Sequence, residues 1–286
     1  MERPLIYDVM IYFKMIRPGT LAACISPVMI GLSVASHSVR IDILLAVLTL
    51  LTACSIQIMS NLVNDYFDFK KGNDKEGRLG PARAVSLGLV SVQTLLRFIF
   101  FYTFLSILGG IALVWVGGIP ILLIGVSALI FAVLYSATSK SLSHLGIADI
   151  FVLLYYGPLA TLGTTYLQTM QFSLTSLLWG IGCGVISIAV LVVNNVRDYE
   201  QDKEHGKKTL IVRLGLGFGR IYYILLILLP VLMLFVFATY WQGIFQGIIG
   251  IILIALFLHS KGRAYNLVLI LTGVYNLFFT LNLVLI

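Results

Sequence analysis

The chain has 286 residues, of which 59% are hydrophobic and only 11% are charged, and its mean hydropathy is +1.02. Soluble domains carry about 25% charged residues, so this composition excludes a water-soluble globular protein. The net charge of +7 does not indicate nucleic-acid binding, because the basic residues stand in short segments between long apolar stretches.

The N-terminal stretch, residues 1–17, is amphipathic and contains Arg3, Asp8, Lys14 and Arg17. It has no apolar core followed by small residues, so we expect no cleavable signal peptide. Apolar stretches of about 20 residues, the length that crosses a bilayer, then recur along the chain. The sequence therefore predicts a single domain over residues 1–286, an all-α polytopic membrane protein.

Nine membrane spans are expected in chain order. The last three are the hardest to divide, because the polar break at residues 240–243 is short. The predicted spans cover residues 18–36, 42–63, 92–115, 119–138, 147–167, 174–196, 221–240, 243–260 and 265–285.

The basic residues indicate how these spans are oriented. If the N-terminus is cytoplasmic, 18 of the 19 Lys and Arg residues fall on the cytoplasmic side and only Arg40 falls on the other. Cytoplasmic loops of membrane proteins are typically rich in Lys and Arg. We therefore expect a multi-pass protein of the cell membrane, with a cytoplasmic N-terminus and the C-terminus on the opposite side.

Two short polar segments, residues 61–68 and 194–202, follow the second and sixth apolar stretches. They hold five of the 12 acidic residues and lie on the cytoplasmic side in the orientation above. Carboxylates at the end of a membrane helix are costly unless a positive charge balances them, and a divalent cation can be that charge. These segments are therefore the candidate functional site.

Helical spacing places the polar side chains of each segment on one face. At 100° per residue Asn61, Asp65 and Asp68 lie within about 60° of one another, and Asn64 extends that face. The matching stripe in the second segment spans about 80° and consists of Asn194, Asp198 and Asp202. Each helix end thus directs two carboxylates and at least one amide to the same side.

Carboxylate and amide oxygens are the ligands that Mg²⁺ prefers, and Mg²⁺ often completes its shell with water and substrate phosphates. Basic residues follow both segments, where they could hold further phosphate oxygens. The pattern predicts a site for a metal–diphosphate complex; ordinary interfacial ion pairs are the simpler alternative. The expected catalytic residues are Asp65, Asp68, Asp198 and Asp202, and the expected metal ligands are these four with Asn61 and Asn194.

Several groups of residues carry a resemblance to a known family. They are Arg17-Pro18-Gly19-Thr20-Leu21 with Pro27 and Gly31; Gln57, Asn61, Asn64-Asp65-Tyr66-Phe67-Asp68, Lys71-Gly72, Asp74, Arg78-Leu79-Gly80-Pro81 and Arg83; Tyr135-Ser136, Leu142, Leu145-Gly146 and Gly157-Pro158-Leu159; and Asn194-Asn195, Arg197-Asp198, Asp202, Gly206-Lys207, Thr209-Leu210 and Arg213-Leu214-Gly215. Together they resemble the UbiA superfamily of membrane-embedded aromatic prenyltransferases. Within it the chain most resembles the 1,4-dihydroxy-2-naphthoate branch of menaquinone synthesis.

The resemblance implies nine transmembrane helices around a central cavity that opens to lipid. It implies Mg²⁺ as cofactor, a polyprenyl diphosphate donor and 1,4-dihydroxy-2-naphthoate or a similar aromatic acceptor. The prenyl group would replace the ring carboxylate, with loss of CO₂ and diphosphate, giving demethylmenaquinone. The substrate-binding residues implied are Asn61, Asn64, Asn194, Arg78, Arg83, Lys140, Arg197, Lys207, Tyr66 and Asp149.

Two positions depart from the wider pattern. Gly72 stands where the superfamily often has a third Asp, which is similar to the naphthoate branch and tells against a 4-hydroxybenzoate enzyme. Asp149 stands where that branch tends to have Glu, which keeps the charge on a shorter arm. An acid at a helix N-terminus is also favourable by itself, and Tyr66 could simply belong to an interfacial aromatic belt.

Three alternatives remain open from the sequence. The first keeps the enzyme class and changes the acceptor to homogentisate, 4-hydroxybenzoate, haem or a glycerol phosphate. The second is an ion-coupled transporter, which would place its acids near the middle of the bilayer in broken helices. The third is a Mg²⁺-dependent diphosphate hydrolase that uses no acceptor.

Overall fold

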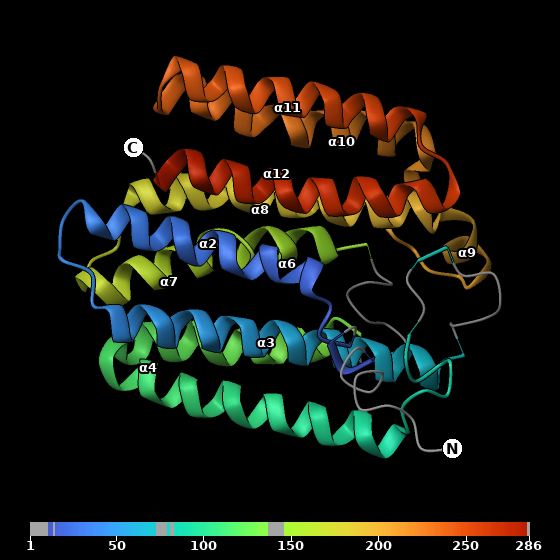
Figure 1. Cartoon of the computed structure of the whole chain (residues 1–286), viewed down its shortest axis with the longest axis horizontal. Coiled ribbons are helices and arrows are strands. Elements are labelled where there is room, and N and C mark those ends of the chain that lie inside the picture. The colour runs from blue at the N-terminus through green and yellow to red at the C-terminus, as the bar shows by residue number, and fades with distance from the viewer. Residues whose placement is uncertain (1–10, 14, 73–78, 81–82, 137–145, 285–286) are drawn as a thin grey trace.

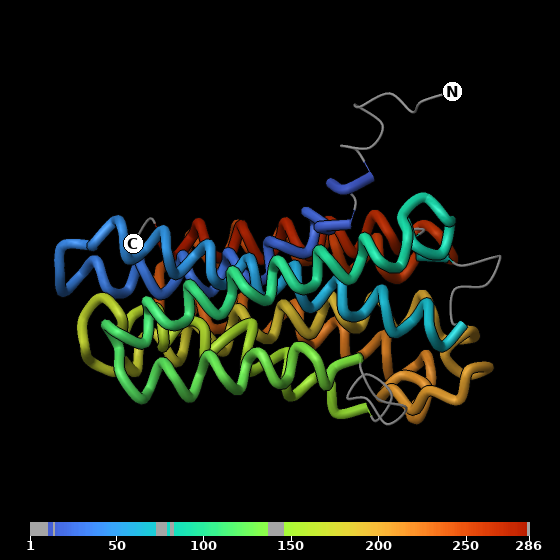
Figure 2. The backbone as a smooth tube through the Cα atoms, turned by 90° about the horizontal axis from the view of Figure 1, so that it is seen from below, coloured from blue at the N-terminus to red at the C-terminus, as the bar shows by residue number. Residues whose placement is uncertain are grey.

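The computed structural model describes residues 11–13, 15–72, 79–80, 83–136 and 146–284. The long helices lie side by side along the longest axis of the molecule, in both views (Figures 1 and 2). In chain order the elements are α2 (Pro18–Ser36), α3 (Ile43–Lys70), α4 (Val92–Leu134), α6 (Ala148–Tyr155), α7 (Pro158–Thr169), α8 (Leu174–Arg197), α9 (Tyr199–Glu204), α10 (Leu210–Phe237), α11 (Tyr240–His259), η1 (Gly262–Ala264) and α12 (Tyr265–Val284).

The predicted all-helical membrane fold is confirmed. In the described part of the chain, eight helices are long and apolar enough to cross a membrane. One of them, α4, has 43 residues and a non-helical backbone at Gly118, where the chain doubles back (Figures 1 and 2). A helix of that length measures about 65 Å, roughly twice the hydrocarbon core. If the parts of α4 before and after Gly118 each cross the membrane, the eight candidate helices provide nine spans. The count of nine stays a prediction.

Short polar residues fix where the helices begin. Asp42 accepts a hydrogen bond from the backbone N–H of Leu45 at 3.0 Å, and Ser91 accepts one from Thr94 at 3.1 Å. These caps satisfy N–H groups that the first helical turn leaves free. At the start of α11 Thr239 forms a capping box with Gln242. The break between the seventh and eighth predicted spans therefore lies at residues 238–239 and not at 240–243.

Helix α8 lies at the centre of the bundle. It is the most buried of the candidate spans, because 72% of the residues in its apolar 18-residue stretch are buried inside the protein. Glycine allows the neighbouring backbone to approach it. A Cβ atom on Gly180 would lie 2.8 Å from Cα of Pro158, the first residue of α7. Small residues at such contacts let helices pack tightly in a membrane, where apolar surface alone does not drive association.

Two predicted ends differ from the structure in a way that matters for the site. The second span was expected to end at residue 63, but α3 continues to Lys70. The seventh was expected to begin at residue 221, but α10 begins at Leu210, with a break at Gly215. In both cases the helix extends beyond its apolar part. The first acidic segment is therefore helical throughout.

Candidate active site at the polar end of the bundle

The first acidic segment occupies the last turns of α3. The side chains of Asp65 and Asp68 are only 9% and 16% exposed, although both carry charge. The Nε atom of Arg83 lies 2.9 Å from Asp65 Oδ1, and its Nη2 atom lies 2.5 Å from Asp68 Oδ2. A guanidinium presents several donors in a fixed plane, so one arginine can serve two carboxylates. The predicted site residue Arg83 is therefore in direct contact with both predicted aspartates.

Asp65 has a second cationic partner, Arg17, whose Nη2 atom pairs with its Oδ1 atom. Arg17 stands immediately before α2, 48 residues away in sequence, and adopts a left-handed backbone with φ 54°. An L-residue rarely takes this conformation without compensating contacts. From the sequence alone, Arg17 is a topological charge and part of the family resemblance, and it is not among the predicted site residues.

Asn61 belongs to a polar chain that runs away from the carboxylates into the bundle. Its Nδ2 atom donates to Thr20 Oγ1 at 2.8 Å, and its Oδ1 atom accepts from Gln57 at 3.4 Å. Tyr156 donates to Gln57 Oε1 at 2.5 Å. These bonds fix the orientation of a predicted metal ligand. Two other predicted substrate-binding residues lie on the same turns of α3. Asn64 is half-buried, and Tyr66 packs against an apolar cluster, as an interfacial aromatic would.

The second acidic segment joins α8 to α9. Arg197 is almost fully enclosed, with a side chain 2% exposed. Its Nε and Nη2 atoms donate to the two carboxylate oxygens of Asp198 at 2.8 and 2.7 Å, and Nη2 also donates to Asn194 Oδ1 at 2.5 Å. Two-pronged pairing of this kind is among the strongest charge-assisted contacts. Arg197, Asp198 and Asn194 therefore form one unit.

Asp202, on the short helix α9, pairs with Lys207, whose Nζ atom lies 2.7 Å from Oδ1. Burial raises the pKa of Asp202, the nearby Lys207 lowers it, and the carboxylates of Asp198 and Asp68 raise it again. Asp68 belongs to the other segment. Its effect on Asp202 shows that the two acidic segments lie close enough to act on one another.

The ends of α3 and α8 lie with α9 at the same end of the bundle (Figure 1). We call this end, with the residues of both acidic segments and their basic partners, the polar end.

Lys71, at the end of α3, is influenced by charges at both segments. Burial lowers the pKa of Lys71, Asp68 raises it and Lys207 lowers it. Lys71 also donates to the backbone carbonyl of Ser136 at 2.9 Å, which ties the end of α3 to the end of α4.

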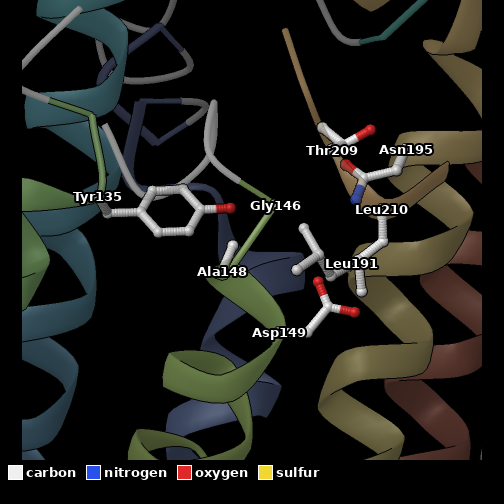
Figure 3. Close-up of a pocket in the computed structure, with 8 residues that line it drawn as sticks. All are labelled: Tyr135, Gly146, Ala148, Asp149, Leu191, Asn195, Thr209 and Leu210. Atoms are coloured by element: carbon white, nitrogen blue, oxygen red, sulfur yellow. The ribbon is translucent and has the colours of Figure 1, made fainter. Parts of the chain in front are cut away.

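A small pocket lies between α6, α8 and the start of α10, with Tyr135, Asp149 and Asn195 facing it (Figure 3). It encloses about 20 Å³, which is room for one water molecule. Asp149 accepts a hydrogen bond from Tyr222. The pocket is too small for an aromatic bicycle, so the central cavity implied by the resemblance stays a prediction.

The donor atoms at the polar end are carboxylate and amide oxygens. Among the residues that the structure describes, no three His, Cys, Asp or Glu side chains gather around one point as a ready metal site. The four motif carboxylates instead contact basic groups: Arg17, Arg83, Arg197 and Lys207. The metal assignment therefore stays a prediction. Two further predicted residues, Arg78 and Lys140, lie outside the described part of the chain.

Comparison with known proteins agrees with this arrangement. Residues 24–273 match the UbiA prenyltransferase family. A 1,4-dihydroxy-2-naphthoate octaprenyltransferase from Escherichia coli (strain K12) is 36% identical over 71% of this chain and 68% of that protein. The protein of the same name from Mycobacterium tuberculosis is 32% identical over 86% of this chain and 83% of its own length.

Solved structures share the fold at low identity. A UbiA homologue from Archaeoglobus fulgidus, with DMAPP and Mg²⁺ bound, superposes with a TM-score of 0.65 at 18% identity, over 95% of this chain and 97% of that one. An apo UbiA homologue from Aeropyrum pernix K1 gives 0.69 at 14% identity, over 93% and 97%. Together with the sequence matches, this shows that the chain is a multi-pass membrane protein and belongs to the UbiA prenyltransferase family.

Proposed function

We propose that the chain transfers a polyprenyl group from a polyprenyl diphosphate to 1,4-dihydroxy-2-naphthoate, releasing CO₂ and diphosphate and giving demethylmenaquinone. The supporting observation from the structure is the pairing of acidic and basic side chains at one end of an apolar bundle. A prenyl diphosphate has the same division, with an apolar tail and a polyanionic head. The choice of acceptor is supported by the names of the relatives, five of which are 1,4-dihydroxy-2-naphthoate octaprenyltransferases.

The residues at the polar end fit Mg²⁺ as the cofactor. All the predicted ligands offer hard oxygen atoms, which Mg²⁺ prefers over nitrogen and sulfur. Mg²⁺ commonly uses one or two protein carboxylates together with substrate phosphates, so a ready cluster of three acids is not required. When bound, the ion would supply positive charge that stabilises the departing diphosphate.

The basic side chains at the polar end have a matching role in the proposal. Arg17, Arg83 and Lys207 balance buried carboxylates in the described structure. A diphosphate would offer these cations oxygen partners of higher charge. Asp65, Asp68, Asp198 and Asp202 would hold the metal, which would supply positive charge to the head group, and the basic side chains would hold phosphate oxygens.

The reaction breaks the allylic C–O bond, and its electron pair leaves with the diphosphate. The ring carbon of the acceptor that bears the carboxylate forms the new C–C bond. Loss of CO₂ leaves its electron pair in the ring and restores the aromatic system. The burial of Asp65, Arg83 and Arg197 supports a site in which the electron-poor prenyl group would be shielded from water. Asp149, Asn64, Tyr66 and the remaining predicted residues Arg78 and Lys140 are assigned to substrate binding as part of this proposal.

The positions of the basic residues support a cytoplasmic polar end and N-terminus. The acidic segments share that end with most of the Lys and Arg residues, as the positive-inside rule would place them. In this orientation the head groups of both substrates approach from the cytoplasm, and the prenyl tail lies in the bilayer.

The test uses purified protein in detergent or liposomes with a labelled polyprenyl diphosphate. We expect prenylated product with 1,4-dihydroxy-2-naphthoate, no product with EDTA, and recovery with excess Mg²⁺. Asp65→Asn and Asp198→Asn should each lower turnover at least about 100-fold, as loss of a charge-stabilising group does in other enzymes.

The matched control is Asp42→Asn, the same change at the opposite end of α3. Asp42 caps the helix there, and Asn caps nearly as well, so turnover should stay normal. Turnover with homogentisate or 4-hydroxybenzoate alone would reject the naphthoate acceptor. Release of free prenol without any acceptor would indicate a hydrolase, and full activity of Asp65→Asn would reject the metal assignment.

A further inference from the structure

Arg197 has a partner outside its own segment. Besides Asp198 and Asn194, it donates from Nη1 to Asn266 Oδ1 at 2.7 Å. Asn266 lies in the first turn of α12, 69 residues along the chain. The guanidinium that holds the second acidic segment is therefore also held to the last helix of the bundle.

The other end of the Asn266 amide reaches the first half of the chain. Its Nδ2 atom donates to the backbone carbonyl of Leu79 at 3.0 Å, across 187 residues of sequence. The Leu79 side chain also lies next to Gly262, at the start of η1: a Cβ atom on Gly262 would be 4.0 Å from it. Leu79 comes four residues before Arg83, which pairs with Asp65 and Asp68.

We propose that Asn266 is a positioning residue for the diphosphate site. It connects Arg197 of the second acidic segment to the stretch of chain that brings Arg83 to the first. The inference rests on the function proposed above. The two hydrogen bonds of its side chain go to Arg197 and to the Leu79 carbonyl, so it acts through Arg197 and Arg83.

The chemistry of the amide suits this role. A guanidinium can only donate hydrogen bonds and a backbone carbonyl can only accept them, so the connecting side chain must accept on one side and donate on the other. Asn and Gln are the amide side chains that do both in this way. An Asp in this position would still accept from Arg197, but it would place a negative oxygen against the Leu79 carbonyl.

A positioning role predicts an effect on diphosphate binding. When the bond to Leu79 is lost, Leu79 is held less firmly in the free protein, and substrate binding must fix its position. Asn266→Ala and Asn266→Asp should therefore raise the KM for polyprenyl diphosphate about tenfold, the effect of one lost hydrogen bond. The KM for the acceptor and kcat should change much less.

A conservative variant and a control on the same helix separate positioning from general stability. Asn266→Gln keeps both functional groups on a longer arm and should recover part of the loss. Asn282 is also on α12, near its other end, and donates to Gln246 Oε1 at 3.0 Å. Asn282→Ala removes a comparable hydrogen bond, so it should lower the melting temperature without changing the KM for the donor.

Limited trypsin digestion gives a readout that does not depend on activity. Cleavage between α3 and α4, mapped by mass spectrometry, should be faster in Asn266→Ala and Asn266→Asp than in wild type or Asn282→Ala. An unchanged donor KM with unchanged cleavage would overturn the inference, and so would a KM change shared with Asn282→Ala. If wild type transfers no prenyl group the proposed function fails, while the digestion still tests the link from Asn266 to Leu79.

Discussion

At the end of α3, Asp65 and Asp68 are balanced by Arg17 and Arg83, which come from before α2 and before α4. At the end of α8, Asp198 is instead balanced by the adjacent Arg197. The first segment thus takes its cations from distant parts of the chain, and the second contains its main cation within itself.

The difference shows how two similar sequence patterns can serve different purposes. Asp198 and Arg197 are fixed together by the end of one helix, so their geometry is set as soon as α8 forms. The pairs of Asp65 exist only when three parts of the chain have come together. The charge balance of the first segment therefore depends on how the helices pack, whereas the Asp198–Arg197 pair does not.

The largest expected effect is that of Arg83→Gln. It leaves two buried carboxylates with one fewer cation, and breaking a buried ion pair costs about 3–5 kcal/mol. We expect a lower melting temperature in detergent together with loss of turnover. Asp65 would keep Arg17 as a partner, so Arg83→Gln combined with Asp68→Asn should recover part of the melting temperature, since the second carboxylate that lost the Arg83 contact is then neutral. A wild-type melting temperature for Arg83→Gln would contradict long-range pairing in the first segment.

The sequence predicted the residue types of the site better than their partners. Helical spacing placed Asn61, Asp65 and Asp68 on one face, and the charge of Arg83 indicated a phosphate contact. The contacts of Arg17 with Asp65 and of Asn266 with Arg197 join residues 48 and 69 positions apart. No local pattern encodes such contacts, because they depend on how the helices pack.

Helix ends were missed for a related reason. Hydropathy falls after residue 63, so the second span is expected to end at that residue, but paired carboxylates let α3 continue to Lys70. The chain from Leu210 to 220 carries Arg213 and Arg220 and was expected to be a loop for the same reason. Averaged hydropathy detects the apolar part of a helix, but it does not detect the polar residues through which the helix continues.

A smaller effect is expected for Arg17→Gln. The Arg17 side chain is 29% exposed, and Asp65 would keep Arg83 as a partner. We expect a loss of about 1 kcal/mol, close to the upper range for partly exposed ion pairs. Chemical denaturation of Arg17→Gln and Arg83→Gln side by side measures the difference. Equal losses would show that Asp65 depends on both arginines alike.

The smallest and most specific effect concerns pH in the second segment. Burial raises the pKa of Asp202, and Lys207 counteracts this. Lys207→Gln removes the lowering influence, so the pKa of Asp202 should rise further. If turnover needs ionised Asp202, the acid limb of the pH–rate profile must then move to higher pH. Lys261→Gln, an exposed lysine outside both segments, should leave the limb in place. A limb that stays fixed or moves to lower pH in Lys207→Gln would show that Asp202 does not need to be ionised or does not depend on Lys207.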